Sequence, residues 1–456
     1  MSVTSMFTAV SGMNVNGKGL AVVGDNIANM NTHGFKSSSI VFADIVSQSV
    51  GSDGVGRGAL VNAVSQEFTQ GAFENTPNVL DLAVDGDGLF VVKKVNDTFY
   101  TRAGQFGIDK QGFATNADGY RLQGYQFDVS GAASTVVGDV NVASINSQPN
   151  DTADVMVYAN LDSRTDITNL ANPAFDVNNA AATSHFTSTI TVYDSLGNSH
   201  VLNIYYRKNQ PIGAGGTPAN SGTPYGGGLT WPAGYPAAGG NEWEWYAVVS
   251  GTDSTAGIDQ IQAQGRLEFN TNGALYYAET LPSPTSGFDF AGGATQDQAI
   301  AFDFGDSIAS AGASGLEGTT QFGATSTTSY LDQDGYSAGT LKSLTINEDG
   351  LMSGIFTNGQ TKNIAQVVLA KFISQEGLIK QGNSLYAESF ESGQPIVTAP
   401  GNSGTGQILS NTLEISNVDL AAEFVKMIIM QRGFQANSRM VATSDELMTE
   451  LVNLKR

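Results

Sequence analysis

Apolar residues near the amino terminus recur at steps of three and four, which is the spacing of one face of a long helix. Between residues 3 and 29 this face has eight positions, and six of them are apolar. The pattern predicts a helical segment over residues 1–30 whose apolar seam contacts another helix. The eight positions are Val3, Met6, Val10, Met13, Gly17, Leu20, Gly24 and Ile27.

The other faces of this predicted helix are poorly suited to water, because Lys18 and Asp25 are their only charged residues. The helix also contains interior glycines, each of which costs about 1 kcal/mol relative to alanine. We therefore expect the isolated segment to be largely unfolded and to need partners on several sides. The glycines are Gly12, Gly17, Gly19 and Gly24.

A second seam occupies the carboxyl-terminal residues 416–456. Ser416 and Asn417 can cap a helix, and Asp419 follows Ser416 by three residues as in a capping box. Both seams could pack on this chain's own core, but no segment between them resembles a helical bundle. Apolar residues recur every seven positions at Leu420, Met427, Phe434, Val441 and Met448, flanked by Phe424, Ile428, Leu451 and Val452.

The middle of the chain is predicted to be β-structure. Residues 68–140 and 341–397 alternate short apolar runs with glycine turns, which is typical of antiparallel hairpins. Residues 187–193 and 201–206 flank a Ser-Leu-Gly-Asn turn and predict a hairpin in a separate all-β unit. Residues 208–241 are crowded with Gly, Pro and Ala, which predicts a flexible insertion or a long loop.

Composition agrees with a β-rich chain, because the 456 residues include 54 Gly and only 14% are charged. The formal net charge of −22 repels phosphate backbones and anionic lipid surfaces, so we expect neither nucleic-acid binding nor membrane insertion. No apolar run approaches the ~20 residues of a membrane span. The first basic residue is Lys18, so no cleaved secretory signal is predicted. Unless another route exports it, the protein is expected in the cytoplasm.

No arrangement of residues predicts catalysis or a bound cofactor. The absence of Cys excludes thiol nucleophiles and Cys-ligated metals. Residues 12–18 have the glycine and lysine spacing of a P-loop, but Gly19 stands where Ser or Thr would hold Mg²⁺. His33 is far in sequence from His185 and His200, which we expect at the surface of one hairpin. We therefore predict no catalytic residue, no metal site and no cofactor.

The most specific segment follows the first predicted helix. Asn and Gly accept left-handed backbone angles, and Asn side chains bond to nearby amides, so the cluster ends the helix and fixes a turn. A simple helix cap needs fewer polar turn residues than this segment has. Its residues are Asn26, Asn29, Asn31, Thr32, Gly34, Phe35 and Lys36.

This segment resembles the signature of the axial proteins of the bacterial flagellum, the family of rod, hook and hook-associated proteins. The resemblance extends over most of the chain. On the amino-terminal side it includes residues 68–71, 81–88 and 101–106, and on the carboxyl-terminal side residues 358–360, 377–378, 392–393, 416–420, 431–437 and 451–454.

The resemblance implies a mainly β fold with terminal α-helices, in a discontinuous multidomain axial protein. The terminal helices would pair in an inner tube built from many subunits, with radially stacked β-domains outside it. The implied divisions are a terminal helical domain of residues 1–30 and 416–456, a connecting segment of 31–74 and 401–415, an inner β-domain of 75–149 and 331–400, and an outer β-domain of 150–330 that contains the insertion 208–241.

Rod members of the family are markedly shorter, and the segment of residues 150–330 is similar to the outer domain of hook members. The resemblance therefore implies a non-enzymatic structural subunit that polymerises into the hook, the flexible joint that transmits motor torque from rod to filament. Its implied partners are many copies of itself, the flagellar rod, the hook cap, the hook–filament junction proteins and the flagellar type III export apparatus. Such a protein lies in the extracellular hook of the flagellum and is exported without a cleaved signal peptide.

Two other functions stay open, a distal rod subunit and a secreted surface or carbohydrate-binding β-protein. The second would need an aromatic binding platform, for which Trp231, Trp243 and Trp245 are the tryptophan candidates, although we expect them to be packed. In the hook interpretation, the two seams are assembly surfaces. Their residues are Met6, Val10, Met13, Leu20, Ile27, Leu420, Phe424, Met427, Phe434, Val441 and Met448.

Overall fold

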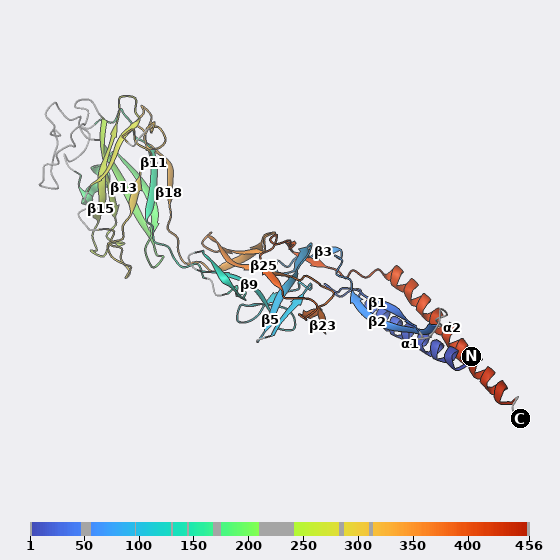
Figure 1. Cartoon of the computed structure of the whole chain (residues 1–456). Coiled ribbons are helices and arrows are strands. Elements are labelled where there is room, and N and C mark those ends of the chain that lie inside the picture. Colours follow the sequence, from blue (N-terminus) through green and yellow to red (C-terminus); the bar gives the residue numbers. More distant parts are fainter. Residues whose placement is uncertain are drawn as a thin grey trace. The chain divides into compact units, whose positions relative to one another are not determined.

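The computed structural model describes residues 2–46, 56–95, 97–128, 131–143, 146–166, 175–208, 241–281, 287–309 and 313–453. It divides into two compact units. The terminal unit comprises Met1–Asn146 and Leu341–Arg456, and the insert unit comprises Ser147–Thr340. The fold is mainly β with one helix at each end, as the sequence predicts. Figure 1 shows the elements of both units.

Two long helices contact each other in the terminal unit. They are α1 (Ser2–Ala28) and α2 (Leu420–Asn453), and Figure 1 shows them side by side. An antiparallel hairpin of β1 (Ser38–Val46) and β2 (Gly56–Gln66) packs against α1. Residues 31–74 are predicted only as a connecting segment, so this hairpin is not expected from the sequence.

The rest of the terminal unit is an inner β-domain in which strands from both chain halves interleave. Its largest sheet has 13 strands, and β9 joins the two halves by pairing with β21. Smaller pairs join β4 to β26 and β3 to β27. Leu82, Phe90, Val92 and Ile364 lie in its fully buried core.

The bounds of these strands in the first chain half are β3 (Phe73–Asn75), β4 (Leu82–Asp85), β5 (Leu89–Lys94), β6 (Asp97–Thr101), β7 (Gly107–Ile108), β8 (Ala114–Thr115), β9 (Arg121–Phe127) and β10 (Ala133–Asp139). In the second half they are β19 (Leu341–Ile346), β20 (Leu351–Phe356), β21 (Thr361–Val367), β22 (Leu369–Lys371), β23 (Ile379–Gly382), β24 (Leu385–Ala387), β25 (Ile396–Thr398), β26 (Gln407–Ser410) and β27 (Thr412–Glu414).

The insert unit consists of a five-stranded antiparallel sheet and a three-stranded sheet that share one apolar core. The first sheet has the order β12-β13-β14-β15-β16, and the second has the order β17-β11-β18. The strands are β11 (Asp154–Asn160), β12 (Phe186–Tyr193), β13 (Ser199–Lys208), β14 (Asn241–Val249), β15 (Gln260–Phe269), β16 (Leu275–Leu281), β17 (Ala301–Asp303) and β18 (Thr327–Gln333), with a 3-10 helix, η2 (Val177–Ala182).

The hairpin predicted over residues 187–206 is present as β12 and β13. The unit boundaries fall at 146/147 and 340/341, whereas the sequence analysis places them at 149/150 and 330/331. The second boundary lies later because β18 crosses residue 330 and pairs with β11. The predicted insertion lies outside the described residues, apart from its first and last positions, Lys208 and Asn241.

Trp243 and Trp245 are completely buried in the core of the insert unit, so neither forms a surface platform. Trp231 lies outside the described residues. The expectation that His200 lies at the surface is wrong. Its side chain is 6% exposed, its Nε2 lies 3.0 Å from Asp194 Oδ2, and its ring stacks on Phe290. The contact with His200 offsets part of the free-energy cost of burying the Asp194 carboxylate.

Buried carboxylates lie on the opposite face of the five-stranded sheet from the two tryptophans. Glu242 is directly opposite Glu268 in the β14–β15 pairing, and both side chains are at least nine-tenths buried. Burial, together with the charges of Glu244 and Glu268, raises the pKa of Glu242 to about 7. The ionised form of Glu242 therefore destabilises the folded unit.

We expect Glu242→Gln to stabilise the insert unit at pH 8 by about 3 kcal/mol, because a rise of roughly 2.5 pKa units corresponds to that energy. The stability of the unsubstituted chain falls as pH rises from about 4.5 to about 7, so the gain should vanish near pH 4. Denaturant unfolding of the full chain, followed by Trp fluorescence, measures this unit because all three tryptophans lie in it.

The exposed Glu317→Gln is the matched control and should leave the unfolding free energy unchanged at both pH values. An equal gain for Glu242→Gln at pH 4 and pH 8 would contradict the assignment of the effect to ionisation.

Candidate functional site

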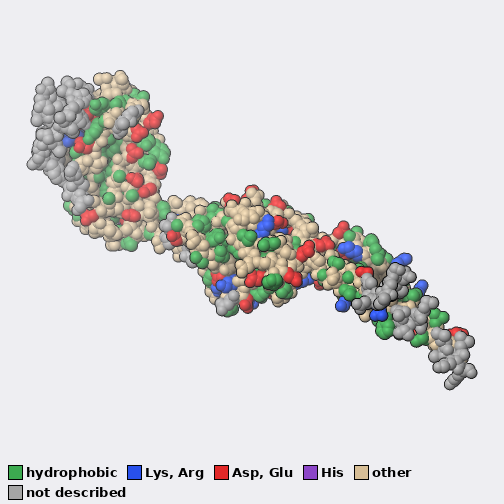
Figure 2. Space-filling model, viewed as in Figure 1, with side chains coloured by type: hydrophobic (Ala, Val, Ile, Leu, Met, Phe, Trp, Pro, Cys, Tyr) green, Lys and Arg blue, Asp and Glu red, His purple; other side chains and the backbone are tan. Residues whose placement is uncertain are grey.

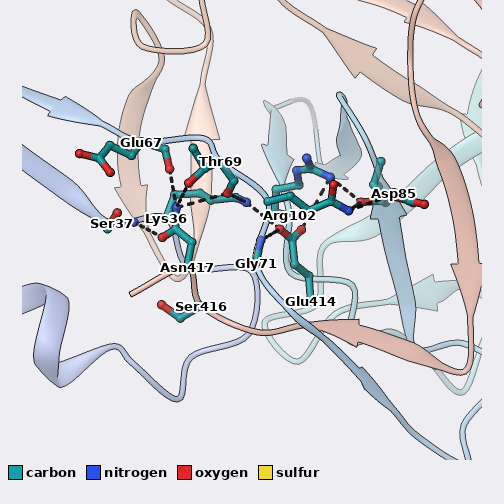
Figure 3. Close-up of polar contacts among 12 residues, drawn as sticks. Lys36, Ser37, Glu67, Thr69, Gly71, Asp85, Arg102, Glu414, Ser416 and Asn417 are labelled. Carbon is teal, nitrogen blue, oxygen red and sulfur yellow. Dashed lines mark hydrogen bonds and ion pairs between the residues drawn. The ribbon is translucent and has the colours of Figure 1, made fainter. Parts of the chain in front are cut away.

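A buried cluster of charges joins the two chain ends to the inner β-domain. Lys36 Nζ lies 2.7 Å from Glu414 Oε1, with both side chains almost fully buried. Arg102 Nη1 lies 3.6 Å from the other carboxylate oxygen, Glu414 Oε2. Figure 3 shows these side chains converging from three segments of the chain. We call Lys36, Arg102 and Glu414 the charged joint.

Backbone groups on the residue 69–71 segment complete the charged joint. The N–H of Gly71 donates to Glu414 Oε1 over 2.8 Å, and Lys36 Nζ donates to the carbonyl of Thr69 over 2.6 Å. Lys36 follows the turn after α1, and Glu414 is the last residue of β27. The joint therefore fastens the start of the chain to its returning end.

Arg102 anchors the joint in the inner β-domain, because its guanidinium donates to the carbonyls of Val84 and Gly86 over 3.0 and 2.6 Å. Burial lowers the pKa of both the Lys36 ammonium and the Arg102 guanidinium, while the charge of Glu414 opposes that change. The attraction of one carboxylate thus favours the charged form of two buried cations.

Asn417 makes a second connection beside the charged joint, as Figure 3 shows. Its Oδ1 accepts a hydrogen bond from the N–H of Ser37 over 2.7 Å. Its Nδ2 donates to the Glu67 carbonyl over 2.8 Å and to Thr69 Oγ1 over 2.9 Å. One amide therefore connects two earlier segments, at Ser37 and at residues 67–69, to the residues just before α2.

The predicted motif residues Gly34 and Phe35 lie against the same region. Gly34 has a φ of 68°, and a Cβ on it would lie 2.4 Å from the backbone nitrogen of Ala103, so only glycine fits there. Its N–H donates to the backbone carbonyl of Glu414 over 2.8 Å. Phe35 is buried, and the Lys380 ammonium lies 4.7 Å from its ring centroid.

Asn26 connects α1, the hairpin and α2. Its side chain exchanges two hydrogen bonds with the backbone of Ser38, of 2.8 and 2.9 Å. Its Nδ2 also lies 3.3 Å from Glu423 Oε2, and Glu423 Oε1 accepts from Lys426 over 2.7 Å. Because Asn26 is buried, the polar contacts replace those that water would make.

The remaining motif residues end α1. Asn29 Nδ2 donates to the Asp25 carbonyl over 2.9 Å, and Thr32 Oγ1 donates to Asn29 Oδ1 over 3.2 Å. Asn31 is exposed and lines a groove of about 620 Å³ together with Asp25 and Lys380. The structure thus places Gly34, Phe35 and Lys36 at the joint, Asn26 between α1, the hairpin and α2, and Asn29, Asn31 and Thr32 at the helix end.

The sequence analysis does not single out Glu414, the centre of the joint. Arg102 is noticed only as part of a matching motif, and Asn417 as part of another and as a possible helix cap. The available signal is the position of Glu414 between the apolar residues Leu413 and Ile415, where a buried acidic residue needs a cationic partner. Lys36 lies 378 residues from Glu414, so spacing alone does not connect them.

The predicted seam of α1 does not coincide with its buried face. Ala9, Val15 and Val23 are buried, whereas Met6 is exposed. The residues Val10, Met13, Leu20 and Ile27 are half-buried. Small residues explain the offset, because a Cβ on Gly12 would lie 2.6 Å from Asn437 in α2, so the helices touch at glycine.

The predicted seam residues of α2 also fall into a half-buried group and an exposed group. Leu420, Met427 and Val441 are half-buried, while Phe424, Phe434 and Met448 are 50%, 40% and 38% exposed. Figure 2 shows hydrophobic side chains at the surface of this part of the molecule, next to Lys and Arg. That these exposed side chains serve assembly remains a prediction.

Within the part of the chain that the structure describes, no three His, Cys, Asp or Glu side chains come close enough to hold a metal ion. Among the described helices, none combines the length and apolar character needed to cross a membrane. The contacts of this site are structural, since each charged group faces another part of the same chain.

We expect Glu414→Gln to destabilise the terminal unit by about 3–5 kcal/mol, because it leaves two buried cations without their carboxylate. Calorimetry of the full chain should show a lowered transition for this unit, while the Trp fluorescence transition of the insert unit stays in place. Glu67→Gln, at an exposed position beside the joint, is the control. A change below about 1 kcal/mol for Glu414→Gln would contradict the role given to the joint.

Models of flagellar protein families match most of the chain. The flagellar hook protein FlgE/F/G D1 domain matches residues 83–160, and the flagellar basal body protein FlaE D2 domain matches residues 160–336. At the ends, the flagella basal body rod protein model matches residues 6–36, and the C-terminal model of flagellar basal body rod FlgEFG proteins matches residues 409–454.

Curated relatives match from end to end. The flagellar hook protein FlgE of Treponema pallidum is 33% identical over 99% of this chain and 99% of its own length. The flagellar hook protein FlgE of Salmonella typhimurium is 33% identical over 99% of this chain and its full length. The flagellar hook protein FlgE of Escherichia coli is 31% identical over 98% of this chain and 99% of its own length.

A crystal structure of the Helicobacter pylori flagellar hook protein FlgE2 aligns with 74% of this chain and 98% of that chain. The TM-score is 0.46 and the sequence identity is 15%.

Proposed function

The chain belongs to the family of flagellar hook proteins, and from this premise we propose that it is the structural subunit that polymerises into the hook. Many copies would assemble through their terminal helices into an inner tube, with the β-domains outside it. The hook then acts as the flexible joint that passes motor torque from rod to filament.

The exposed apolar side chains of α2 are the observation that carries this proposal. Phe424 and Phe434 are 50% and 40% exposed in the single chain. Large apolar surfaces of this kind mark sites of protein association. Heterologous contacts between copies that do not close into a ring generate a helical polymer.

The proposed mechanism is mechanical and not catalytic. Torsional stiffness would come from the packed helices of neighbouring copies, and bending would come from small sliding movements between outer β-domains. The charged joint supports this division, because it fixes the helices to the inner β-domain of the same copy by buried contacts that resist deformation.

The subunit would contact other copies of itself, the rod, the hook cap and the hook–filament junction proteins. It would reach the extracellular hook of the flagellum through the type III export apparatus without a cleaved signal peptide. Its glycine-interrupted α1 suits a route that moves unfolded chains, because interior glycines weaken an isolated helix.

The competing functions have less support. A distal rod subunit would be shorter, whereas these curated hook relatives match nearly the whole chain. A carbohydrate-binding surface would use exposed aromatic side chains, but Trp243 and Trp245 are buried. Neither family description nor relative names an enzymatic activity.

We expect Phe434→Asp to abolish polymerisation and motility. Phe434 is 40% exposed in the single chain, so burying the remainder between copies contributes about 1 kcal/mol per subunit. An unpaired carboxylate in its place adds a desolvation cost. Melting of the β-domains in the soluble monomer should not change. Electron microscopy of concentrated protein and calorimetry of the monomer measure the two effects.

Thr449→Asp, on an exposed position one residue beyond Met448, is the milder control and should leave filaments intact. Normal filaments from Phe434→Asp would exclude this part of α2 from the assembly surface. A collapsed monomer transition would place Phe434 in the core of its own chain instead.

A further inference from the structure

An exposed row on α2 combines apolar side chains with one cation. Phe424, Val425, Ile428 and Ile429 are 50–61% exposed, and Arg432 is exposed one turn after Ile428. Phe424, Ile428 and Arg432 follow at four-residue steps and therefore lie on one side of the helix. We call these five residues the α2 row.

The α2 row faces away from α1. Close approaches between the helices pair Asn26 with Glu423, Gly19 with Met430, Asn16 with Gly433 and Gly12 with Asn437. At about 100° per residue these α2 positions lie opposite Ile428. The α2 row is therefore not covered by the helix pairing of its own copy.

One face of the β1–β2 hairpin has the complementary pattern. In the pairing register Ile40 lies opposite Val64 and Phe42 lies opposite Val61, so these four apolar side chains share a face. Phe42 and Val64 are 40% and 52% exposed. Asp44, two residues after Phe42 on the same face, is also exposed. We call these five residues the hairpin face.

The two surfaces match in spacing and in charge. Along β1, Ile40, Phe42 and Asp44 are separated by steps of about 6.6 Å. Along α2, Phe424, Ile428 and Arg432 are separated by steps of about 6 Å. An apolar row that ends in a carboxylate can therefore lie along an apolar row that ends in a guanidinium, with Asp44 facing Arg432.

We propose that the hairpin face of one copy packs on the α2 row of a neighbouring copy, with an ion pair between Asp44 and Arg432. This inference rests on the proposed function as a polymer subunit. The five residues of the α2 row, and Phe42, Asp44 and Val64 on the hairpin face, are exposed in the single chain, so the contact needs a second copy. Because the two surfaces differ, the contact is heterologous and can repeat from copy to copy without closing.

Because the natural chain has no Cys, a pair of introduced cysteines reports one contact. We expect filaments of Phe42→Cys/Ile428→Cys to give, after mild oxidation, a ladder of disulfide-linked multimers on a non-reducing gel. The full chain is polymerised first and its filaments are checked by electron microscopy. Disulfide formation requires Cα atoms within about 7 Å, so a ladder requires direct contact.

Phe42→Cys/Thr443→Cys is the matched control. Thr443 is exposed on α2 about 22 Å beyond Ile428, so this pair should give no ladder. Filaments of the test pair without a ladder would overturn the proposed contact and leave the proposed function standing. Dimers from Ile428→Cys alone, at the yield of the double variant, would overturn it in favour of contact between two α2 helices. Failure of the unsubstituted chain to polymerise would instead contradict the proposed function.

Charge reversal tests the ion pair without relying on the apolar substitutions. We expect Asp44→Arg and Arg432→Asp each to raise the concentration needed for polymerisation by about tenfold, and the double reversal to restore it to within about threefold. If each single reversal raises the concentration needed for polymerisation and the double reversal does not lower it again, a direct Asp44–Arg432 contact is contradicted. This result holds even where the cysteine variants fail to polymerise.

Discussion

The position of one carboxylate, Glu414, organises the terminal unit. Its two oxygens face Lys36 and Arg102, and its backbone carbonyl accepts from Gly34. A buried ion pair adds little net stability compared with apolar packing, but removing one partner is costly. The charged joint therefore acts by permitting one arrangement of the chain ends and penalising the others. This arrangement fixes the chain ends to the inner β-domain.

The elements with the strongest periodicity could be predicted from the sequence. Both terminal helices and the β12–β13 hairpin appear where apolar spacing places them. The buried face of α1 is displaced by one position from the predicted apolar seam. The reason is that Gly12 and Gly19 make the closest approaches to α2, and a search for apolar spacing does not count glycine as a contact residue. The β1–β2 hairpin was missed, since large apolar side chains such as Val41 and Phe42 point to both of its faces.

The candidate site was predictable only in part. Asn26, Gly34 and Lys36 stand out as an unusual turn sequence, but their partners Glu423 and Glu414 lie almost 400 residues away. Pairing strands β3 with β27 and β4 with β26 brings these ends together, and such non-local pairing has no signal in spacing. A buried charged residue needs a partner of opposite charge, but that partner can be identified only after the strand pairing is known.

The two units differ in the chemistry of their surfaces. The difference fits a terminal unit that binds neighbouring copies and an insert unit that keeps its distance from them. The helices expose apolar side chains, whereas residues 147–340 hold 19 acidic and four basic side chains. Like charges on neighbouring insert units repel and disfavour close, fixed contacts between them. Strong contacts in the helical part and weak contacts elsewhere are what a polymer needs if it is to bend without breaking.

A reconstruction by cryo-electron microscopy of filaments grown from the purified full chain tests the central claim most directly. We expect a tube whose inner wall is formed by α1 and α2 of many copies, with α2 buried between neighbours and the insert units outermost. A protein that stays monomeric at high concentration, or filaments whose terminal helices lie unpacked outside the wall, would contradict it.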